Sequence, residues 1–481
     1  MNCSFQVLVY KNLQTWPCAS VRQIMGKELK CPVLGAPWTA CLLIAISLSI
    51  ALLMLENTPS WRNQIPNWRG ASDAGEVGEV AGEGDALKDL LRRLVRGEER
   101  YQLEVGGFTC HFDLDAEMCL SAKPVRISNG GLTVHVPSDG SGFTRSVRPY
   151  ARIGDELAMK LTTPVQILHR DMANLPACNF THSIPAVIFS TGVTGNAYHE
   201  LSEIIIPLFL ACRHFRSQLK FVATDYNEWW IRKYSTVLNR LSDYEALDLS
   251  DGGVHCFPAA VVGLRYHGNL ALNASNVPLG HSMPEFRQFL RESYNLKTKN
   301  VHEIDKLHKP VLILISRTNS RKILNEDAIV ELAQELGFQV VTAGPSMMSN
   351  LELFAKMVSS CSVFIGVHGA GLTNEIFLPD GAVVIQVVLL GLEWGSTNYY
   401  GSPATAMGLQ YLEYKIEPQE SSLAEVYGLD HPVIVDPLSV FAKGYMAVRA
   451  VYVDGQDVKI NLDRFKATLE EAMRLVGHST T

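Results

Sequence analysis

A histidine and a glutamate that follow a glycine-bearing turn, Ser190–Asn196, have the types and spacing needed for acid–base chemistry. His199 and Glu203 are four residues apart. A helix would therefore place them on one face, where the carboxylate can orient the imidazole and balance its charge. That arrangement is typical of a general base. The alternative is an ordinary pair on a helix surface, without a catalytic role.

A second group of residues predicts an anion site. Val363–Val367 is typical of a buried strand, and it leads into a glycine-rich turn and a short helix that stops before Pro379. Gly369 and Gly371 lack Cβ, so the backbone there can turn sharply and lie close to a ligand. The free N–H groups at the start of the helix favour a phosphate. The alternative is a turn needed only for tight packing of strand and helix.

Arginines follow another predicted strand and are expected at the same edge of the sheet. Ser316 and Arg317 end that strand, and Arg321 comes shortly after. A guanidinium fork pairs with two oxygens at once, which suits a diphosphate. Solvated loop arginines are the alternative. His368, in the glycine turn, could donate to a phosphate or form a hydrogen bond within the turn.

Alternating strands and helices must position these residues. Upstream, Ala186–Ser190 and Phe221–Thr224 are predicted strands with a helix over Leu201–Arg213 between them, which favours a parallel sheet. Downstream, β-α units repeat and indicate a Rossmann-like lobe, with ligands at the carboxyl ends of the strands. The predicted downstream elements are strands over Pro310–Ser316, Gln339–Thr342, Val363–Val367 and Ala382–Val388, and helices from N-cap Asn325 to Gly337 and over Asn350–Ser359.

Length and composition indicate a two-lobed globular protein with additional segments. The 481 residues exceed one ordinary domain, and 47% hydrophobic with 19% charged residues is typical of a folded chain. A net charge of −7 argues against a nucleic-acid partner, which calls for a concentrated basic face. The motifs of serine hydrolases and of dinucleotide-binding dehydrogenases are absent from the sequence.

The N-terminal part predicts a membrane anchor. Trp38–Leu55 is apolar and uncharged, and basic residues precede it while Glu56 and an acidic stretch follow. A run of about 18 residues just spans the hydrocarbon layer, and the charge bias places the N-terminus in the cytosol. We therefore predict a type II signal anchor; a cleaved signal peptide is the alternative. The Gly/Ala/Glu-rich stretch that follows predicts a flexible stem, with a short helix capped by Asp85 near its end.

The cysteines and sequons fit an oxidising compartment beyond that anchor. Cys110 and Cys119 are the first-choice disulfide pair, and the connectivity of the other cysteines stays open. Asn179 and Asn273 begin N-glycosylation sequons. Asp113-Leu114-Asp115 has the form of a metal-binding motif but lies between the paired cysteines, so we interpret it as a disulfide-bounded loop.

Five segments of the chain carry a recognisable pattern: Val367–Asn374 with Leu378-Pro379, Ser316-Arg317, Thr194–His199, Val254–Pro258 and Gly391–Trp394. Together these segments resemble glycosyltransferase family 61. The resemblance extends from about Cys110 to the C-terminus and is closest to the plant, grass-expanded branch, whose members add arabinofuranosyl or xylosyl side chains to xylan in the Golgi. Val193 and Glu200 depart from the residues expected in this branch, as does the lack of an arginine between Cys110 and Cys119, which leaves donor and acceptor open.

The resemblance implies an α/β fold of GT-B type, in which two Rossmann-like lobes face a cleft. It implies inversion at the anomeric carbon, with His199 as the base and Glu200 or Glu203 as alternatives. The donor would be UDP-arabinofuranose or UDP-xylose, held without a predicted metal. The donor-binding residues would be Ser316, Arg317, Arg321, His368, Gly369, Ala370, Gly371, Leu372, Thr373 and Asn374.

The expected organisation is a single-pass type II protein of the Golgi membrane with xylan or a related polysaccharide as acceptor. Homo- or hetero-oligomers are compatible with it, and a non-catalytic luminal partner of cell-wall synthases with the same fold is the alternative function. The expected segments are a cytosolic tail (1–35), a transmembrane anchor (36–56), a flexible stem (57–100), an acceptor-side lobe (101–305) and a nucleotide-sugar lobe with a terminal helix (306–481).

Overall fold

The computed structural model describes residues 83–478 except positions 114, 139–141, 273, 278 and 305–308. The predicted cytosolic tail and membrane anchor lie outside these residues, as do most of the predicted stem and the sequon residue Asn273. Within the described residues, no helix combines the length and the apolar character that crossing a membrane requires.

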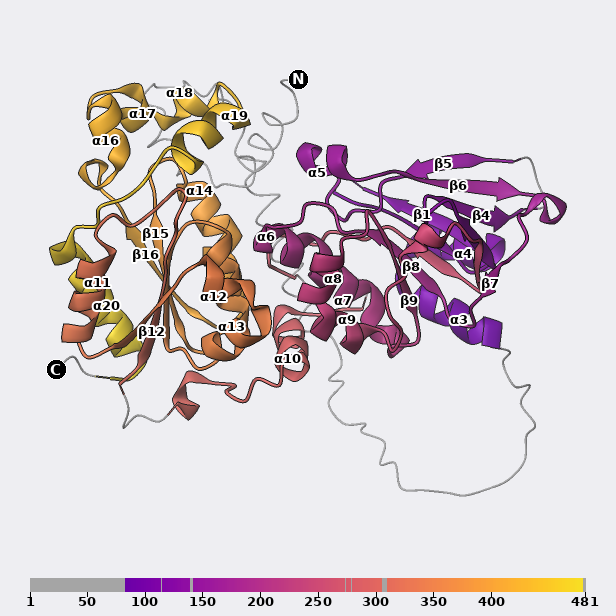
Figure 1. Cartoon of the computed structure of the whole chain (residues 1–481), viewed down its shortest axis with the longest axis horizontal. Coiled ribbons are helices and arrows are strands. Elements are labelled where there is room, and N and C mark those ends of the chain that lie inside the picture. Colours follow the sequence, from indigo (N-terminus) through magenta and orange to yellow (C-terminus); the bar gives the residue numbers. More distant parts are fainter. Residues whose placement is uncertain are drawn as a thin grey trace, which may run out of the picture. The chain divides into compact units, whose positions relative to one another are not determined.

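The downstream part is built on a five-stranded sheet in which every neighbouring pair is parallel (Figure 1). Its central strands are continuous buried apolar runs, as expected where helices cover both faces. In spatial order the strands are β13 (Gln339–Ala343), β12 (Val311–Ile315), β14 (Val363–Val367), β15 (Val383–Val388) and β16 (Gln410–Lys415).

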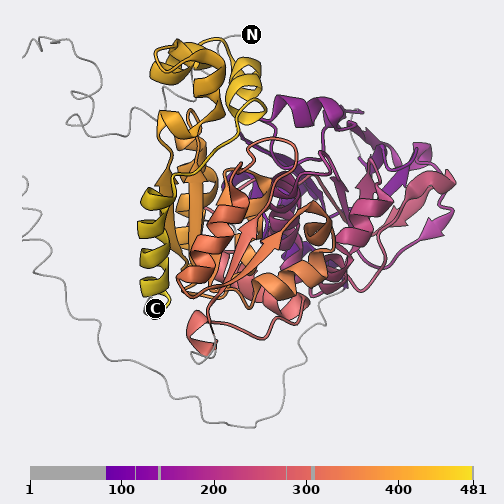
Figure 2. The same cartoon turned by 60° about the vertical axis from the view of Figure 1, so that its left-hand side comes forward.

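Helices cover both faces of this sheet. On one face lie α11 (Glu326–Glu335) and α20 (Leu462–Leu475), and on the other lie α12 (Pro345–Ser349) and α13 (Leu351–Val358) (Figures 1 and 2). The strand order is that of a doubly wound sheet, and the order reverses between β12 and β14. In such sheets ligands bind at the carboxyl ends of the strands beside this reversal. The topology therefore points to the turns that follow β12 and β14.

Two asparagines precede helices but act differently. Asn350 caps α13, because its side chain accepts a hydrogen bond from Leu353 N at 3.1 Å. Asn325 occupies the N-cap position of α11, as predicted, but its amide instead pairs with both backbone groups of Ile460, at 2.8 and 2.9 Å. It thereby ties the segment before α20 to the start of α11.

The upstream part contains a mixed five-stranded sheet. β8 (Ala186–Ser190) lies between β9 (Lys220–Thr224) and β11 (Ala260–Val262), and both pairings are parallel. The hairpin of β1 (Phe108–Phe112) and β2 (Glu117–Ser121) extends it in antiparallel fashion. Cys110 and Cys119 face each other in this hairpin and form a disulfide.

A second upstream sheet, with six strands, was not anticipated from the sequence. Its strands are short and alternate in burial, so they give a weak periodic signal. A disulfide connects Cys256, in its fifth strand, to Cys178, just before its last strand. In spatial order these are β5 (Thr144–Val147), β6 (Val165–Arg170), β4 (Thr133–Pro137), β3 (Val125–Ser128), β10 (His255–Phe257) and β7 (Phe180–Thr181).

Two helices occupy the end of the predicted stem. α3 (Glu83–Arg92) and α4 (Gly97–Gly106) are folded, and Leu91 and Leu103 are fully buried in the upstream core. The stem therefore ends earlier than position 100, because these leucines have a core to join. Asp85 lies inside α3 and does not cap it.

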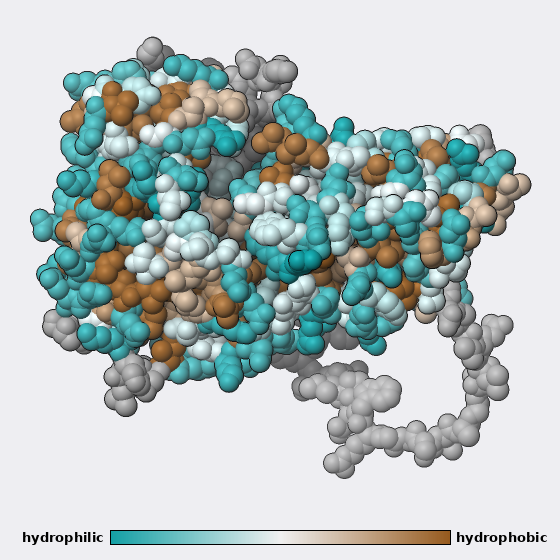
Figure 3. Space-filling model, viewed as in Figure 1, coloured by the Kyte–Doolittle hydropathy of each residue, from teal (hydrophilic) through white to brown (hydrophobic). Residues whose placement is uncertain are grey.

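A group of short helices lies beyond the carboxyl ends of the downstream strands (Figures 1 and 2). Apolar side chains lie among polar ones on their surface (Figure 3), and Leu438 and Met446 are largely exposed. The helices are α16 (Ser422–Tyr427), α17 (Pro432–Val435), α18 (Pro437–Phe441) and α19 (Tyr445–Val448).

A buried arginine connects α10 (Met283–Ser293) to the segment after β14. Arg287 is 1% exposed, and its guanidinium donates to the backbone carbonyls of Ile376, Leu378 and Met407. It also donates to Asp380 at 2.6 Å. Burial and the nearby Arg291 lower the pKa of Arg287 to about 10. The side chain thus satisfies several carbonyls that would otherwise be buried without partners.

Replacing Arg287 by methionine should lower the free energy of unfolding by about 3–5 kcal/mol, because the buried carbonyls lose their donor and Asp380 keeps only its contact with Arg291. Chemical denaturation measures the loss. The matched control is Arg232→Met, since the Arg232 side chain is 76% exposed and pairs with the exposed Glu228. This substitution should cost less than about 1 kcal/mol. Equal losses in the two variants would show that the Arg287 contacts contribute no more to the free energy of unfolding than an exposed ion pair.

Candidate active site

The glycine turn after β14 is shaped by two arginines. Gly369 has φ 151°, a conformation that favours glycine. A Cβ on Gly369 would lie 2.7 Å from Nη1 of Arg317 and 2.9 Å from Nη1 of Arg321. Only a residue without a side chain allows the two guanidinium groups to come this close to the backbone. The 3-10 helix η7 (Ala370–Phe377) begins immediately afterwards, and its first N–H groups have no partner within the helix.

The arginines are held in place by backbone contacts. Arg321 donates from Nη1 to the carbonyl of His368 at 3.0 Å, and Arg317 donates from Nε to Ser320 O at 2.8 Å. Arg321 has φ 57°, a left-handed conformation that costs a non-glycine residue about 1 kcal/mol. Burial and the charge of Arg317 lower the pKa of Arg321 to about 10. Two cations are therefore concentrated where the topology predicts a ligand.

His368 supports the turn as a neutral ring. Burial, followed by the charges of Arg321 and Arg317, lowers its pKa to about 3. Its Nδ1 lies 3.1 Å from Gln386 Nε2 and 3.2 Å from Ser396 Oγ. Since an amide nitrogen only donates, Nδ1 is the acceptor and the proton is on Nε2.

The remaining predicted donor-site residues divide into two groups. Leu372, Thr373 and Asn374 are buried, and Asn374 Nδ2 donates to Gly371 O at 2.9 Å. These buried side chains therefore support the turn from the protein interior. Ala370 is partly exposed at the start of η7, and Ser316 donates its backbone N–H to Ala343 O at the end of β12.

The second predicted constellation is also assembled. His199 lies in α6 (Ala197–Glu200), and Glu203 lies in the π-helical segment η3 (Leu201–Ile205) that continues it. His199 Nδ1 is 2.9 Å from Glu203 Oε2. Burial alone lowers the pKa of His199, but the hydrogen bond and the charge of Glu203 outweigh it and raise the pKa above 6.5. The pair has the geometry of a base with an orienting carboxylate.

Three residues missed by the sequence analysis complete this network. Tyr150 donates to Glu203 Oε2 at 2.5 Å, and Arg152 donates to Oε1 at 3.0 Å. Asp155 Oδ2 lies 3.9 Å from His199 Nδ1. All three come from one loop far upstream in the sequence, so spacing carried no signal for them.

Glu200 faces a different set of partners. Its carboxylate accepts hydrogen bonds from Gly195 N and Tyr234 OH, both at 2.8 Å, and from Lys233. Glu200 is fully buried and holds the glycine-bearing turn before α6. It lies next to His199 in sequence but does not contact the imidazole in these hydrogen bonds, since adjacent helical residues point in different directions.

The structure contains one candidate metal-binding group among the described residues: Asp155, His199 and Glu203, with ligand atoms within 4.8 Å of one another. Arg152, Tyr150 and His199 already contact Glu203, and a guanidinium beside the group opposes a cation. The Asp113 motif is a turn, because Asp113 Oδ1 accepts from the backbone N–H groups of Asp115 and Ala116, both at 2.8 Å.

Aromatic rings bridge the two constellations. Tyr198, beside His199, contacts Tyr399 and Tyr400 with ring centroids 5.3 and 5.9 Å apart. Tyr400 in turn lies 5.4 Å from the ring of His368. Tyr399 and Tyr400 belong to a second π-helical segment, η8 (Thr397–Gly401), and π-helical turns are frequent at functional sites. The predicted base and the predicted anion site are thus connected by direct ring contacts.

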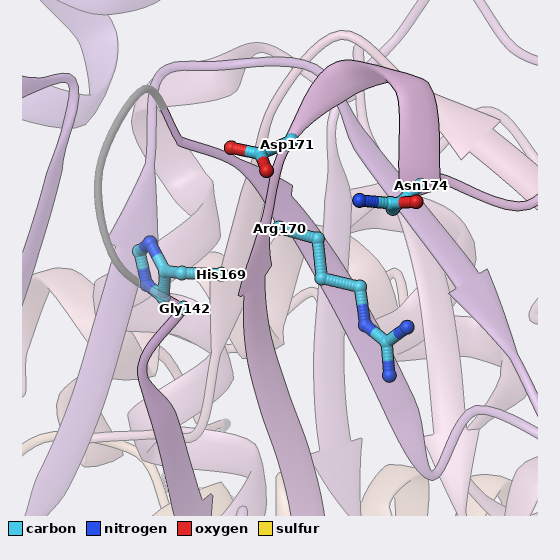
Figure 4. A pocket seen from close by; sticks show the side chains of 5 residues that line it. All are labelled: Gly142, His169, Arg170, Asp171 and Asn174. Carbon is cyan, nitrogen blue, oxygen red and sulfur yellow. The ribbon is translucent and has the colours of Figure 1, made fainter.

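An exposed tryptophan and a pocket lie outside the two constellations described above. Trp230 is fully buried in the core, whereas Trp229 is exposed with Lys233 over its ring. A pocket of about 260 Å³ is formed at the end of β6, where His169 and Arg170 extend to opposite sides (Figure 4). None of the predicted site residues lines this pocket.

Comparison with known proteins identifies the family. The model of the glycosyltransferase 61 family matches residues 198–385, which include His199, Arg317 and the glycine turn. Alpha-1,3-arabinosyltransferase XAT2 of Oryza sativa subsp. japonica is 40% identical over 332 residues, which cover 68% of this chain and 57% of the relative.

Two further plant relatives are covered more completely. Xylan glycosyltransferase MUCI21 of Arabidopsis thaliana is 37% identical, with 68% of this chain and 70% of the relative covered. Beta-1,2-xylosyltransferase XYXT1 of Oryza sativa subsp. japonica is 36% identical, with 73% and 76% covered. These similarities extend well beyond the shared turn, and the chain belongs to glycosyltransferase family 61.

Proposed function

We propose that the protein is an inverting glycosyltransferase that moves a pentose, arabinofuranose or xylose, from a UDP-sugar onto xylan. The observation that carries the proposal is the connection of a two-arginine anion site to a His–Glu pair through Tyr198, Tyr399 and Tyr400. The plant relatives, named as xylan glycosyl-, arabinosyl- and xylosyltransferases, support the sugar and acceptor classes.

The chemistry follows from the two halves of the site. In an inverting transfer, a base removes the proton of the acceptor hydroxyl while the nucleoside diphosphate leaves. His199 takes this proton on Nε2, since Nδ1 donates to Glu203. Arg317, Arg321 and the N-terminus of η7 stabilise the negative charge that develops on the leaving group. These groups supply the required charge without a metal ion, and we propose metal-independent transfer.

We further propose a GT-B arrangement and a luminal location behind an N-terminal type II anchor in the Golgi. The doubly wound downstream sheet supports the first. The apolar stretch Trp38–Leu55 and the disulfides Cys110–Cys119 and Cys178–Cys256 support the second, because disulfides persist in oxidising compartments.

Incubation of the purified protein with UDP-xylose or UDP-arabinofuranose and xylo-oligosaccharides should release UDP and yield a pentosylated product, also in the presence of EDTA. Product mass and released UDP measure the reaction. Absence of turnover with every UDP-pentose and xylan tried would refute the proposed transfer of a pentose to xylan. It would favour a non-catalytic partner with the same fold.

Replacing Arg317 by alanine should weaken UDP binding about 10- to 100-fold, because each hydrogen bond to a charged group contributes about 1.5–3 kcal/mol. Calorimetric titration with UDP measures this without turnover. Arg317→Lys should recover only part of the affinity, since lysine lacks the fork. The exposed Arg474 on α20 provides a control, Arg474→Ala, that should bind UDP normally. Unchanged affinity in Arg317→Ala would place the diphosphate elsewhere.

The rate of transfer should fall as the pH decreases through the raised pKa of His199, because the base must be unprotonated. In Glu203→Gln the charge that raises this pKa is lost, so burial dominates and the acidic limb of kcat/KM should move to lower pH. The maximal rate should also fall, by about 10²-fold or more. Glu228→Gln, at an exposed carboxylate, should change neither. An acidic limb that stays in place in Glu203→Gln would exclude His199 as the titrating base.

A further inference from the structure

Trp394 is an exposed tryptophan in the short helix that comes after β15, the strand that follows the glycine turn. It lies in α14 (Glu393–Ser396), beyond the end of β15, and 55% of its surface is exposed. Tryptophan usually gains free energy from burial. Single exposed apolar residues are nevertheless common, so the surroundings of Trp394 decide what its exposure means.

The surroundings connect Trp394 to both halves of the candidate site. Its ring meets Tyr399 at nearly a right angle, 83°, with centroids 5.8 Å apart. Tyr399 also contacts the rings of Tyr198, at 5.3 Å, and His368, at 6.4 Å. A single ring, that of Tyr399, therefore lies between Trp394 and Tyr198 on one side and between Trp394 and His368 on the other.

The backbone around Trp394 is fixed. Gly391 N donates to Glu393 Oε1 at 3.2 Å, and Asn398 Nδ2 donates to Trp394 O at 2.8 Å. A Cβ on Gly395 would lie 3.4 Å from Cε1 of His368, so this segment packs closely on the histidine ring. Among the described residues, Tyr399 is the only aromatic ring in contact with Trp394. The segment that carries the indole is thus held in place, and the indole itself is half-exposed beside Tyr399.

We propose that Trp394 is a stacking platform for the acceptor and binds the pyranose ring next to the one that receives the transferred sugar. The C–H groups on one face of a pyranose carry partial positive charge and pack favourably on the negative face of an indole. This inference rests on the proposed function and names the part of the acceptor that the site recognises.

The acceptor is favoured over the nucleobase of the donor by the neighbours of Tyr399. The ring of Tyr399 lies closer to Tyr198, at 5.3 Å between centroids, than to His368, at 6.4 Å. Tyr198 in turn contacts the ring of the proposed base His199, at 5.7 Å. The acceptor hydroxyl must reach that base. A chain that reacts there and extends over Tyr399 arrives at Trp394.

The test compares Trp394→Ala with the unaltered protein on xylose acceptors of increasing length. With longer xylo-oligosaccharides, KM for the acceptor should rise about 10-fold or more in Trp394→Ala, as for truncation of an aromatic residue that the bound partner buries. KM for the donor should stay unchanged. With a single xyloside the two proteins should be equal, because no neighbouring ring is present. Trp394→Phe should restore most of the affinity.

The control is Trp229→Ala. Trp229 is exposed to a similar degree, 52%, but Lys233 lies over its ring, with Nζ 5.0 Å from the centroid, and it has no ring contact with Tyr399. Its KM values should not change.

Calorimetric titration of xylohexaose in the absence of donor separates this inference from the proposed function. Weaker binding to Trp394→Ala than to the unaltered protein supports the platform even if no donor is turned over. Equal binding overturns it while leaving the transferase intact. A loss of UDP affinity in Trp394→Ala would also overturn it, because the indole would then contact the nucleobase.

Discussion

The structure depends on holding two positively charged guanidinium groups together in a largely buried place at the edge of the downstream sheet. Arg317 and Arg321 converge on Gly369, and their mutual repulsion adds to the cost of burial, which lowers the pKa of Arg321. The left-handed backbone at Arg321 adds strain. Costs of this kind persist only where the surrounding fold enforces them and a ligand recovers them. A dianionic diphosphate is the partner whose charge and oxygen geometry match two guanidinium forks and a helix N-terminus.

The proposed base, His199, depends on a second buried charge, that of Glu203. A fully buried carboxylate is tolerated only with complete hydrogen bonding, and here Tyr150, Arg152 and His199 provide it. These contacts keep the pKa of Glu203 low despite burial, so the carboxylate stays ionised beside the imidazole. Because a carboxylate only accepts, the Nδ1 proton is fixed and the Nε2 lone pair is left for the acceptor.

Much of the downstream sheet could be predicted from the sequence, because buried parallel strands are unbroken apolar runs separated by helices with clear starts. The strands around Val363 and Val383 and the glycine turn show this. The pairing of His199 with Glu203 was also predictable, because the two residues are only four positions apart in the sequence. Tyr150 and Arg152 were not, because their role depends on long-range packing of an irregular loop. The six-stranded sheet was missed since its strands are too short to show a period.

Aromatic packing connects the proposed place of proton removal with the proposed place where the diphosphate leaves. Tyr198 and Tyr400 are almost fully buried, and their rings fill the space between His199 and His368. Such rings exclude water near His199, which in the proposed reaction favours transfer to an acceptor over hydrolysis of the donor. The groups proposed to handle the proton and the leaving group are thus fixed in or near the core, whereas Trp394 lies on a short exposed segment. If Trp394 binds the acceptor as proposed, substitutions in that segment change which acceptor binds without disturbing either buried charge, and loops on a rigid scaffold are where specificity ordinarily diverges.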